Sequence, residues 1–177
     1  MKIKLPEDLN KLKNLKAGDL VELTTTLYTA RDAAHMRIAK MLENDEALPI
    51  DFTNAFIYYA GPTPTKPGQI VGSIGPTTSA RMDGFANLMP KLHVLGTIGK
   101  GPRSEICSKI YMDNKILYLL ATGGCGALLS KCVISLEEIA FQDLGTESIK
   151  RLEVKDFPVI VAIDQNNNNL FGGKNGH

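Results

Sequence analysis

Hydroxyl groups and one guanidinium lie within five positions of each other in residues 75–83, which read Gly-Pro-Thr-Thr-Ser-Ala-Arg-Met-Asp. The run follows an apolar segment, residues 69–74, whose composition predicts a buried strand. If a helix begins at Thr77 or Thr78, its free N–H groups face the same space as the hydroxyls, with Arg81 one turn further on. This pattern predicts a site for an anion such as a carboxylate, with a reactive hydroxyl beside it. A purely structural helix start is the alternative, because Ser and Thr are common helix caps.

A second group of polar residues lies in residues 28–35, which read Tyr-Thr-Ala-Arg-Asp-Ala-Ala-His. We expect a strand to end and a helix to begin here, with Arg31, Asp32 and His35 on or next to the first turn. A cation opposes the dipole at a helix N-terminus, so Arg31 costs about a few tenths of a kcal/mol unless an anionic ligand or Asp32 pairs with it. A weak surface pair between Arg31 and Asp32 is the alternative, and His35 alone is more often structural than catalytic.

A third group is the loop at residues 96–103, which reads Gly-Thr-Ile-Gly-Lys-Gly-Pro-Arg. Its glycines would let the backbone approach a ligand closely, and Lys100 adds a compact positive charge. The spacing of a nucleotide-binding Walker motif is absent, and a plain turn with an exposed lysine is the alternative. Together, Arg31, Arg81 and Lys100 place a cation at three expected strand ends, where ligands of α/β sheets gather. This arrangement favours a small polyanion, and a dicarboxylate fits.

The glycine-rich run at residues 121–127 could bind an anion, but we expect it to allow close helix packing because it carries no charged side chain. The three cysteines, Cys107, Cys125 and Cys132, form no Cys-x-x-Cys pair, so we expect no metal site within this chain. Cys125 could present a thiol of lowered pKa at a helix start, although a small buried residue is the favoured interpretation. The role of Cys125 stays open.

Branched and aromatic segments alternate with glycine-punctuated helical stretches, which predicts an α/β domain with a mixed sheet and flanking helices. Expected strands cover residues 19–27, 54–60, 69–74, 93–97, 115–121, 132–140 and 158–164. Expected helices cover residues 30–43, 78–89, 103–112, 125–131 and 145–150. The length of 177 residues predicts one domain, residues 1–177, with a frayed tail at residues 166–177.

The overall charge and hydropathy narrow the classes of partner. With 20 Lys and Arg against 19 Asp and Glu, the net charge is +1, so we expect no nucleic-acid partner. The longest apolar runs, such as residues 116–121 and 158–163, fall well short of the ~20 residues that a membrane span needs. Charged residues near the start replace the apolar stretch of a signal peptide. We therefore expect a soluble, cytoplasmic protein.

Four motifs, at residues 28–35, 75–83, 99–101 and 143–158, closely resemble the β subunit of the class I, iron–sulfur-dependent fumarase and L(+)-tartrate dehydratase family. The match runs in order along nearly the whole chain and corresponds to the C-terminal domain of the fused enzymes. The resemblance implies a single swivelling β/β/α domain that closes over a [4Fe-4S] cluster. Three cysteines of a separate α subunit would hold this cluster, so the present chain would supply no metal ligand and would act within a hetero-oligomer.

Residue by residue, the resemblance implies that Arg31, Thr77, Arg81 and Lys100 contact the substrate and that Thr77 is the catalytic base. The two guanidiniums can each hold a carboxylate, and Lys100 can meet the negative charge that develops during the reaction. A hydro-lyase of this family would reversibly hydrate fumarate to malate. The β subunit of an L(+)-tartrate dehydratase is the alternative, because nothing in the chain identifies a partner for the extra hydroxyl of tartrate.

A threonine hydroxyl is a poor base at neutral pH. Thr77 therefore needs nearby cations or a proton relay, for which Asp32 and His35 are the candidates. An alternative from another class is a stand-alone, non-catalytic carboxylate-binding or regulatory module that has no cluster-bearing partner. The presence of all four polar positions argues against such a module.

Overall fold

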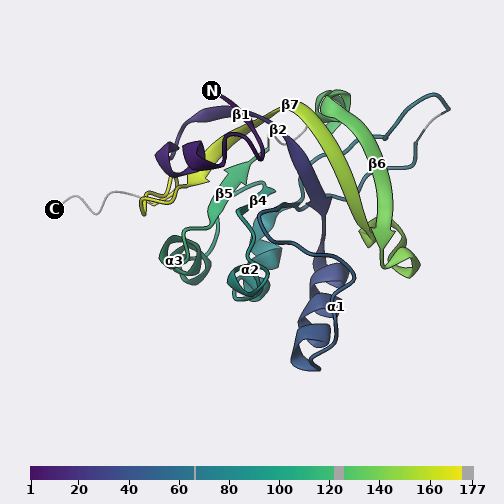
Figure 1. Ribbon diagram of the computed structural model, residues 1–177, viewed down its shortest axis with the longest axis horizontal. Coiled ribbons are helices and arrows are strands. Elements are labelled where there is room, and N and C mark those ends of the chain that lie inside the picture. Colours follow the sequence, from purple (N-terminus) through teal and green to yellow (C-terminus); the bar gives the residue numbers. More distant parts are fainter. Residues whose placement is uncertain (66, 122–125, 173–177) are drawn as a thin grey trace.

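The computed structural model describes residues 1–65, 67–121 and 126–172, and seven strands of one sheet lie within them (Figure 1). The elements, with η denoting a 3-10 helix, are β1 (Lys2–Lys4), η1 (Leu9–Asn14), β2 (Leu20–Thr29), α1 (Asp32–Glu43), β3 (Phe56–Tyr58), η2 (Ser79–Phe85), α2 (Leu88–Lys91), β4 (Gly96–Gly99), α3 (Glu105–Asp113), β5 (Leu117–Leu120), α4 (Gly126–Leu129), η3 (Ser130–Cys132), β6 (Val133–Ala140), η4 (Gln142–Glu147) and β7 (Ile149–Ile163). None of the helices in these ranges is both long and apolar enough to cross a lipid bilayer.

The sheet closes on itself through its longest strand. Strands β1 to β5 run parallel to their neighbours, and β7 pairs antiparallel with both β5 and β2. At one point of β7, Ile160 is the register partner of Leu20 on one side and of Leu120 on the other. Strands β2, β3, β4, β5 and β7 therefore form a five-stranded barrel, with β1 and β6 outside the ring. The expected mixed sheet with flanking helices is confirmed, but the sequence did not reveal its closure.

The central barrel strands β3 and β4 are buried on both faces because one face fills the interior and the other meets the helices. In β3, Phe56 and Tyr58 join a hydrophobic cluster that takes residues from all five barrel strands. Ile57 and the following Tyr59 face the opposite way, into a cluster with residues of α1, α2 and α3. This alternation is the period of two that a strand imposes. Figure 1 shows the three helices on one side of the sheet, with α2 and α3 below β4 and β5 and α1 below the end of β2.

The strand expected at residues 69–74 is wrong, because this segment makes no strand in the structure. Val71 and Ile74 are nevertheless buried in the barrel cluster. The segment folds back on the proline-rich loop, where the N–H of Thr63 donates to the carbonyl of Ser73. Val71 and Ile74 are therefore buried in the core although the segment pairs with no strand.

Two of the expected helices are also wrong. Residues 78–89 form the 3-10 helix η2 and, after a break, the short helix α2. Residues 145–150 contain the end of η4 and the start of β7, because Gly145 adopts φ +60°, a left-handed conformation that interrupts a helix. The helices expected at residues 30–43 and 103–112 are confirmed as α1 and α3, while β1 and η1 were not predicted.

Part of the expected frayed tail is held by hydrogen bonds. The Asp164 carboxylate accepts the backbone N–H groups of Asn166 and Asn168 at 2.8 and 2.9 Å. Residues 166–172 therefore form a turn tied to the end of β7. Residues 173–177 lie outside the described ranges.

Candidate active site

The carboxyl ends of β2, β3 and β4 lie at one edge of the barrel because these strands are parallel neighbours. Arg31 follows β2, and Lys100 follows β4 directly. The run before η2 crosses this edge: the N–H of Thr77 donates to the Tyr59 carbonyl at 2.7 Å, and the N–H of Ser79 donates to the Lys100 carbonyl at 3.0 Å. The three segments that the sequence singled out therefore meet at the same place.

These backbone bonds correct one expectation about how an anion would be held. The N–H groups of Thr77 and Ser79 are already bound to strand carbonyls, and η2 is a short 3-10 helix whose N-cap, Thr78, makes no side-chain cap bond. No α-helix N-terminus with free N–H groups is present at this run. An anion at this edge would depend on the side chains, above all on the cations.

The hydroxyl of Thr77 is half-buried and donates to the carbonyl oxygen of Tyr59 at 3.0 Å. Since its hydrogen is directed at the backbone, the oxygen keeps lone pairs that can accept a proton or a hydrogen bond. In the part of the chain that the structure describes, no hydrogen bond joins Thr77 to Asp32 or His35. The predicted relay through either residue therefore has no direct contact to support it.

Asp32 binds Arg81 rather than its neighbour in sequence. Arg81 Nη2 donates to Asp32 Oδ2 at 2.6 Å, which joins η2 to the first residue of α1. The two side chains are 51% and 33% exposed, so the pair is an accessible one that contributes about 0–1 kcal/mol. Arg81 keeps further N–H donors for a ligand, and the local Arg31–Asp32 pair considered above does not form.

Arg31 is the N-cap residue of α1, and its guanidinium lies half-buried against the backbone of Gly61. A Cβ atom added at Gly61 would lie 3.0 Å from Arg31 Nη1, so the glycine makes room for the side chain. Arg31 Nε is buried and has no hydrogen-bond partner. Within residues 1–65, 67–121 and 126–172, no carboxylate lies within ion-pair distance of this guanidinium. A partly desolvated cation without an acid is unfavourable unless an anion completes the site.

His35 supports Arg31 instead of reaching Thr77. Its Nδ1 lies 2.7 Å from the Arg31 carbonyl oxygen, which assigns the ring hydrogen to Nδ1 because a carbonyl only accepts. Burial lowers the pKa of His35 to about 4, so the ring is neutral at pH 7. The imidazole packs against the rings of Tyr59 and Phe85, and its Nε2 has no partner among the described residues.

Lys100 extends from the loop after β4 and is exposed. The glycines on either side of Lys100 each have a role in the fold. A Cβ at Gly99 would lie 1.8 Å from Ser79 Oγ, so Ser79 packs directly over this position. Gly101 adopts φ +78°, a conformation that side chains with a Cβ rarely take. Both glycines thus fix where the Lys100 backbone lies.

Two acidic residues that the sequence did not single out contact α1, Glu147 at its first turn and Asp143 further along the helix. Glu147 Oε1 accepts the N–H of Ala33 at 3.2 Å, which satisfies a free group at the helix N-terminus. Asp143 accepts two bonds of 2.7 Å from the guanidinium of Arg37. The signal was present in the run at residues 143–158, which the resemblance singled out without assigning a role to its side chains.

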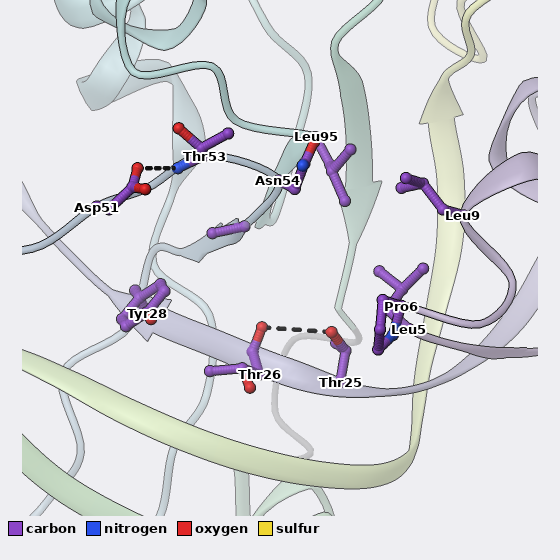
Figure 2. Close-up of a pocket in the computed structure, with 11 residues that line it drawn as sticks. Leu5, Pro6, Leu9, Thr25, Thr26, Tyr28, Asp51, Thr53, Asn54 and Leu95 are labelled. Carbon is purple, nitrogen blue, oxygen red and sulfur yellow. Dashed lines mark hydrogen bonds between the residues drawn. The ribbon is translucent and has the colours of Figure 1, made fainter.

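A cleft of about 260 Å³ lies away from these residues, at the amino ends of β3 and β4 (Figure 2). Its walls include Ala55 and Leu95, which precede those strands, together with Thr25 and Thr26 of β2. None of the six predicted site residues lines it. The candidate site is thus an open edge of the barrel and not this cleft.

The described residues do not fit an iron–sulfur cluster. A cluster needs thiolate ligands, whereas burial raises the pKa of Cys107 to about 12 and also raises the pKa of Cys132. No group of three or more His, Cys, Asp or Glu side chains in the described ranges could hold a metal ion. Cys125 lies outside those ranges.

Comparisons with known proteins define the class. Residues 1–173 match the family model described as "Fumarase C-terminus". Because the match covers nearly the whole chain, the protein belongs to the fumarase C-terminus family, as its motifs predicted.

Individual relatives fall into two groups. The chain is 42% identical over 166 residues to a Methanocaldococcus jannaschii protein named "Putative L(+)-tartrate dehydratase subunit beta", with 90% of this chain and 85% of that protein aligned. It is 35% identical over 164 residues to the Escherichia coli L(+)-tartrate dehydratase subunit beta, with 90% and 80% aligned. It is also 34% identical over 169 residues to the aerobic class I fumarate hydratase of Escherichia coli, but this alignment spans only 31% of that longer protein.

Proposed function

We propose that this chain is the β subunit of a heteromeric hydro-lyase that acts on a small dicarboxylate, with fumarate and malate as the first candidate pair. Family membership and the names of the relatives support the reaction class. A separate α subunit would carry the [4Fe-4S] cluster, because the described residues of this chain do not fit one. On this proposal the chain is inactive alone, and its cytoplasmic location stays a prediction from the sequence.

L(+)-tartrate is the second candidate substrate, favoured by one specific observation. The Methanocaldococcus jannaschii and Escherichia coli relatives that align over 85% and 80% of their own length are named "Putative L(+)-tartrate dehydratase subunit beta" and "L(+)-tartrate dehydratase subunit beta". Fumarate hydratases such as the one from Escherichia coli align over 31% of their length. The alignment therefore spans most of each of these two subunits, although this does not determine the substrate.

The observation that carries the proposal is Arg31, a half-buried guanidinium with a buried, unpartnered Nε at the edge where Thr77 and Lys100 also lie. Such a cation is stable when a carboxylate binds it. Arg81 stands at the same edge with donors beyond those used by Asp32. Two guanidiniums suit a ligand with two carboxylates.

A mechanism for this chain's own residues follows from their chemistry. Arg31 and Arg81 would each hold one carboxylate, which fixes the carbon chain between them. Thr77 would act as an alkoxide: its own hydroxyl proton is released to solvent, and the nearby cations offset the negative charge of the oxygen. The alkoxide would then take the proton from the carbon next to a carboxylate and return to the hydroxyl form. Removing that proton adds negative charge to the carboxylate, and the ammonium of Lys100 would stabilise it.

Activity assays on the chain with a cluster-bearing α subunit test the proposal. The chain alone, the α subunit alone and the reconstituted pair should be prepared without oxygen and assayed with fumarate, malate and L(+)-tartrate. We expect activity only in the pair and a clear preference for one substrate. No activity with any of the three, combined with succinate binding to the chain alone, would favour the carboxylate-binding module instead.

A further inference from the structure

A buried arginine lies directly behind the candidate site. The side chain of Arg103 is 0% exposed, and its Nε donates to Asp83 Oδ1 at 2.5 Å. Its guanidinium carbon also lies 5.4, 4.9 and 5.0 Å from the ring centroids of Tyr59, Tyr111 and Tyr118. Three aromatic faces and one carboxylate therefore offset the loss of water around this charge.

The acid of this pair is held as a charged group. Burial alone would raise the pKa of Asp83, but hydrogen bonds from the Ser104 N–H and from Arg103 outweigh burial and hold the pKa below its ordinary value. Removing either charged partner would leave the other buried and unpaired, which is costly. The geometry of the pair is therefore strongly enforced.

The pair joins the two segments that carry site cations. Asp83 belongs to η2 and follows Arg81 by two residues, while Arg103 follows Lys100 by three. The second oxygen of Asp83 accepts the N–H of Ser104, the N-cap residue of α3, at 2.7 Å. One carboxylate thus connects η2 to the end of the Lys100 loop and to the start of α3.

The other side of the loop is held as well. The Lys100 carbonyl accepts the N–H of Ser79 at 3.0 Å, and the Gly101 carbonyl accepts the hydroxyl of Tyr118 at 2.6 Å. The loop backbone is therefore bound at Lys100 and at the residue that follows it, whereas the Lys100 side chain is exposed. Movement of η2 relative to the loop would have to break the Asp83–Arg103 pair.

We propose that Asp83 and Arg103 are positioning residues that set the separation between the guanidinium of Arg81 and the ammonium of Lys100. With Lys100 beside the carboxylate that Arg31 holds and Arg81 at the other carboxylate, a dicarboxylate of one length can then contact both cations in the orientation that the reaction needs. This inference rests on the proposed function, and it adds two residues that contact no substrate themselves.

A change of spacing should be visible in the length of the ligand that binds best. In the reconstituted enzyme, inhibition constants for malonate, succinate and glutarate should be measured with the wild type, Asp83→Asn and Arg103→Lys. We expect the ratio between the succinate and glutarate constants to change at least about threefold in both variants, together with a lower kcat/KM. The pair formed by Arg37 and Asp143 is the matched control, because Asp143→Asn breaks a bidentate pair elsewhere and should leave the ratio unchanged.

A purely structural role predicts a different result, in which the variants lose stability but keep the wild-type ratio, and this would overturn the inference. Where Arg103→Lys does not fold, Asp83→Asn carries the test alone. Amide exchange of residues 99–104 in the isolated chain separates this inference from the proposed function. Exchange should accelerate in Asp83→Asn but not in Asp143→Asn, even if the reconstituted pair proves inactive, and equal exchange in both would also overturn the inference.

Discussion

The imidazole of His35 binds the backbone of Arg31, with Nδ1 2.7 Å from the carbonyl oxygen. This contact fixes the first turn of α1 and therefore the origin of the Arg31 side chain. Because the ring is buried and neutral, it adds no charge to an edge that already carries three cations. His35 thus acts on the site through the backbone of Arg31.

The pKa of His35 predicts a pH dependence of stability. Its pKa in the folded chain is about 4, against an ordinary value of 6.5 for histidine, so the unfolded chain binds more protons between these values. The contribution of neutral His35 to the free energy of unfolding is fully present above pH 6.5. It is lost as the pH drops toward 4, which lowers the free energy of unfolding by at most about 3 kcal/mol. Urea unfolding at several pH values should show a shallower dependence in His35→Gln. His93→Gln, which changes an exposed histidine, should keep the wild-type dependence.

Replacing Arg31 by Met should separate activity from stability. The substitution keeps an apolar stem but removes the charge, so kcat/KM in the reconstituted enzyme should fall by about 10²–10³. Its free energy of unfolding should equal or exceed that of the wild type, because a half-buried cation without an acid is lost. Arg37→Met, which removes a cation that is paired with Asp143, is the control and should retain activity. Unchanged kinetics in Arg31→Met would mean that Arg31 does not bind the substrate.

The hydroxyl of Thr77 can be tested by a pair of substitutions. Thr77→Ala should lower kcat by about 10²–10⁴, while Thr77→Ser, which keeps the hydroxyl, should restore a large part of it. The backbone N–H of residue 77 still bonds to Tyr59, so the fold and the binding of the α subunit should persist. Thr78→Ala provides a neighbouring control with near-normal turnover. Near-normal turnover in Thr77→Ala would remove this residue from the chemistry.

Asp32 is expected to orient Arg81 and not to carry protons. Asp32→Asn removes the ion pair, so KM should rise several-fold through looser binding, with kcat reduced by less than about tenfold. Stability should change by less than about 1 kcal/mol because the pair is exposed. A kcat reduced by several orders of magnitude, with KM unchanged, would instead support a proton relay through Asp32.

The contact between Gly99 and Ser79 predicts a rescue by a second substitution. Gly99→Ala places a Cβ on the Ser79 side chain and should push the run that carries Thr77 off the barrel edge. We expect a loss of about 1–3 kcal/mol in stability, with reduced activity. The double variant Gly99→Ala, Ser79→Gly should recover part of both. Gly84→Ala, where the added Cβ meets nothing within 4 Å, is the control.

Local sequence pattern predicted the elements whose hydrogen bonds and packing are regular. The helix α1 and the strand β2 are recognisable because helical spacing and branched residues describe their whole length. Residues 69–74 and 78–89 were assigned wrongly because their backbone groups are satisfied by distant partners. Thr77, for example, bonds to Tyr59, eighteen positions earlier in the chain. Barrel closure was missed for the same reason, since β7 pairs with a strand more than 100 residues before it.

The sequence by itself identified the three cations of this edge, because Arg31, Arg81 and Lys100 are recognisable from residue type and spacing alone. Only Arg31 and Lys100 follow parallel strands, whereas Arg81 lies in η2. Only the tertiary structure decided how each is used. Arg31 and Asp32 are neighbours in sequence, yet Asp32 binds Arg81, because η2 passes beside the first turn of α1. Arg31 is left half-buried with no acid partner among the described residues, and Asp83 binds the buried Arg103. Ion pairs depend on distances of a few ångströms across the fold, and no spacing along the chain encodes those distances.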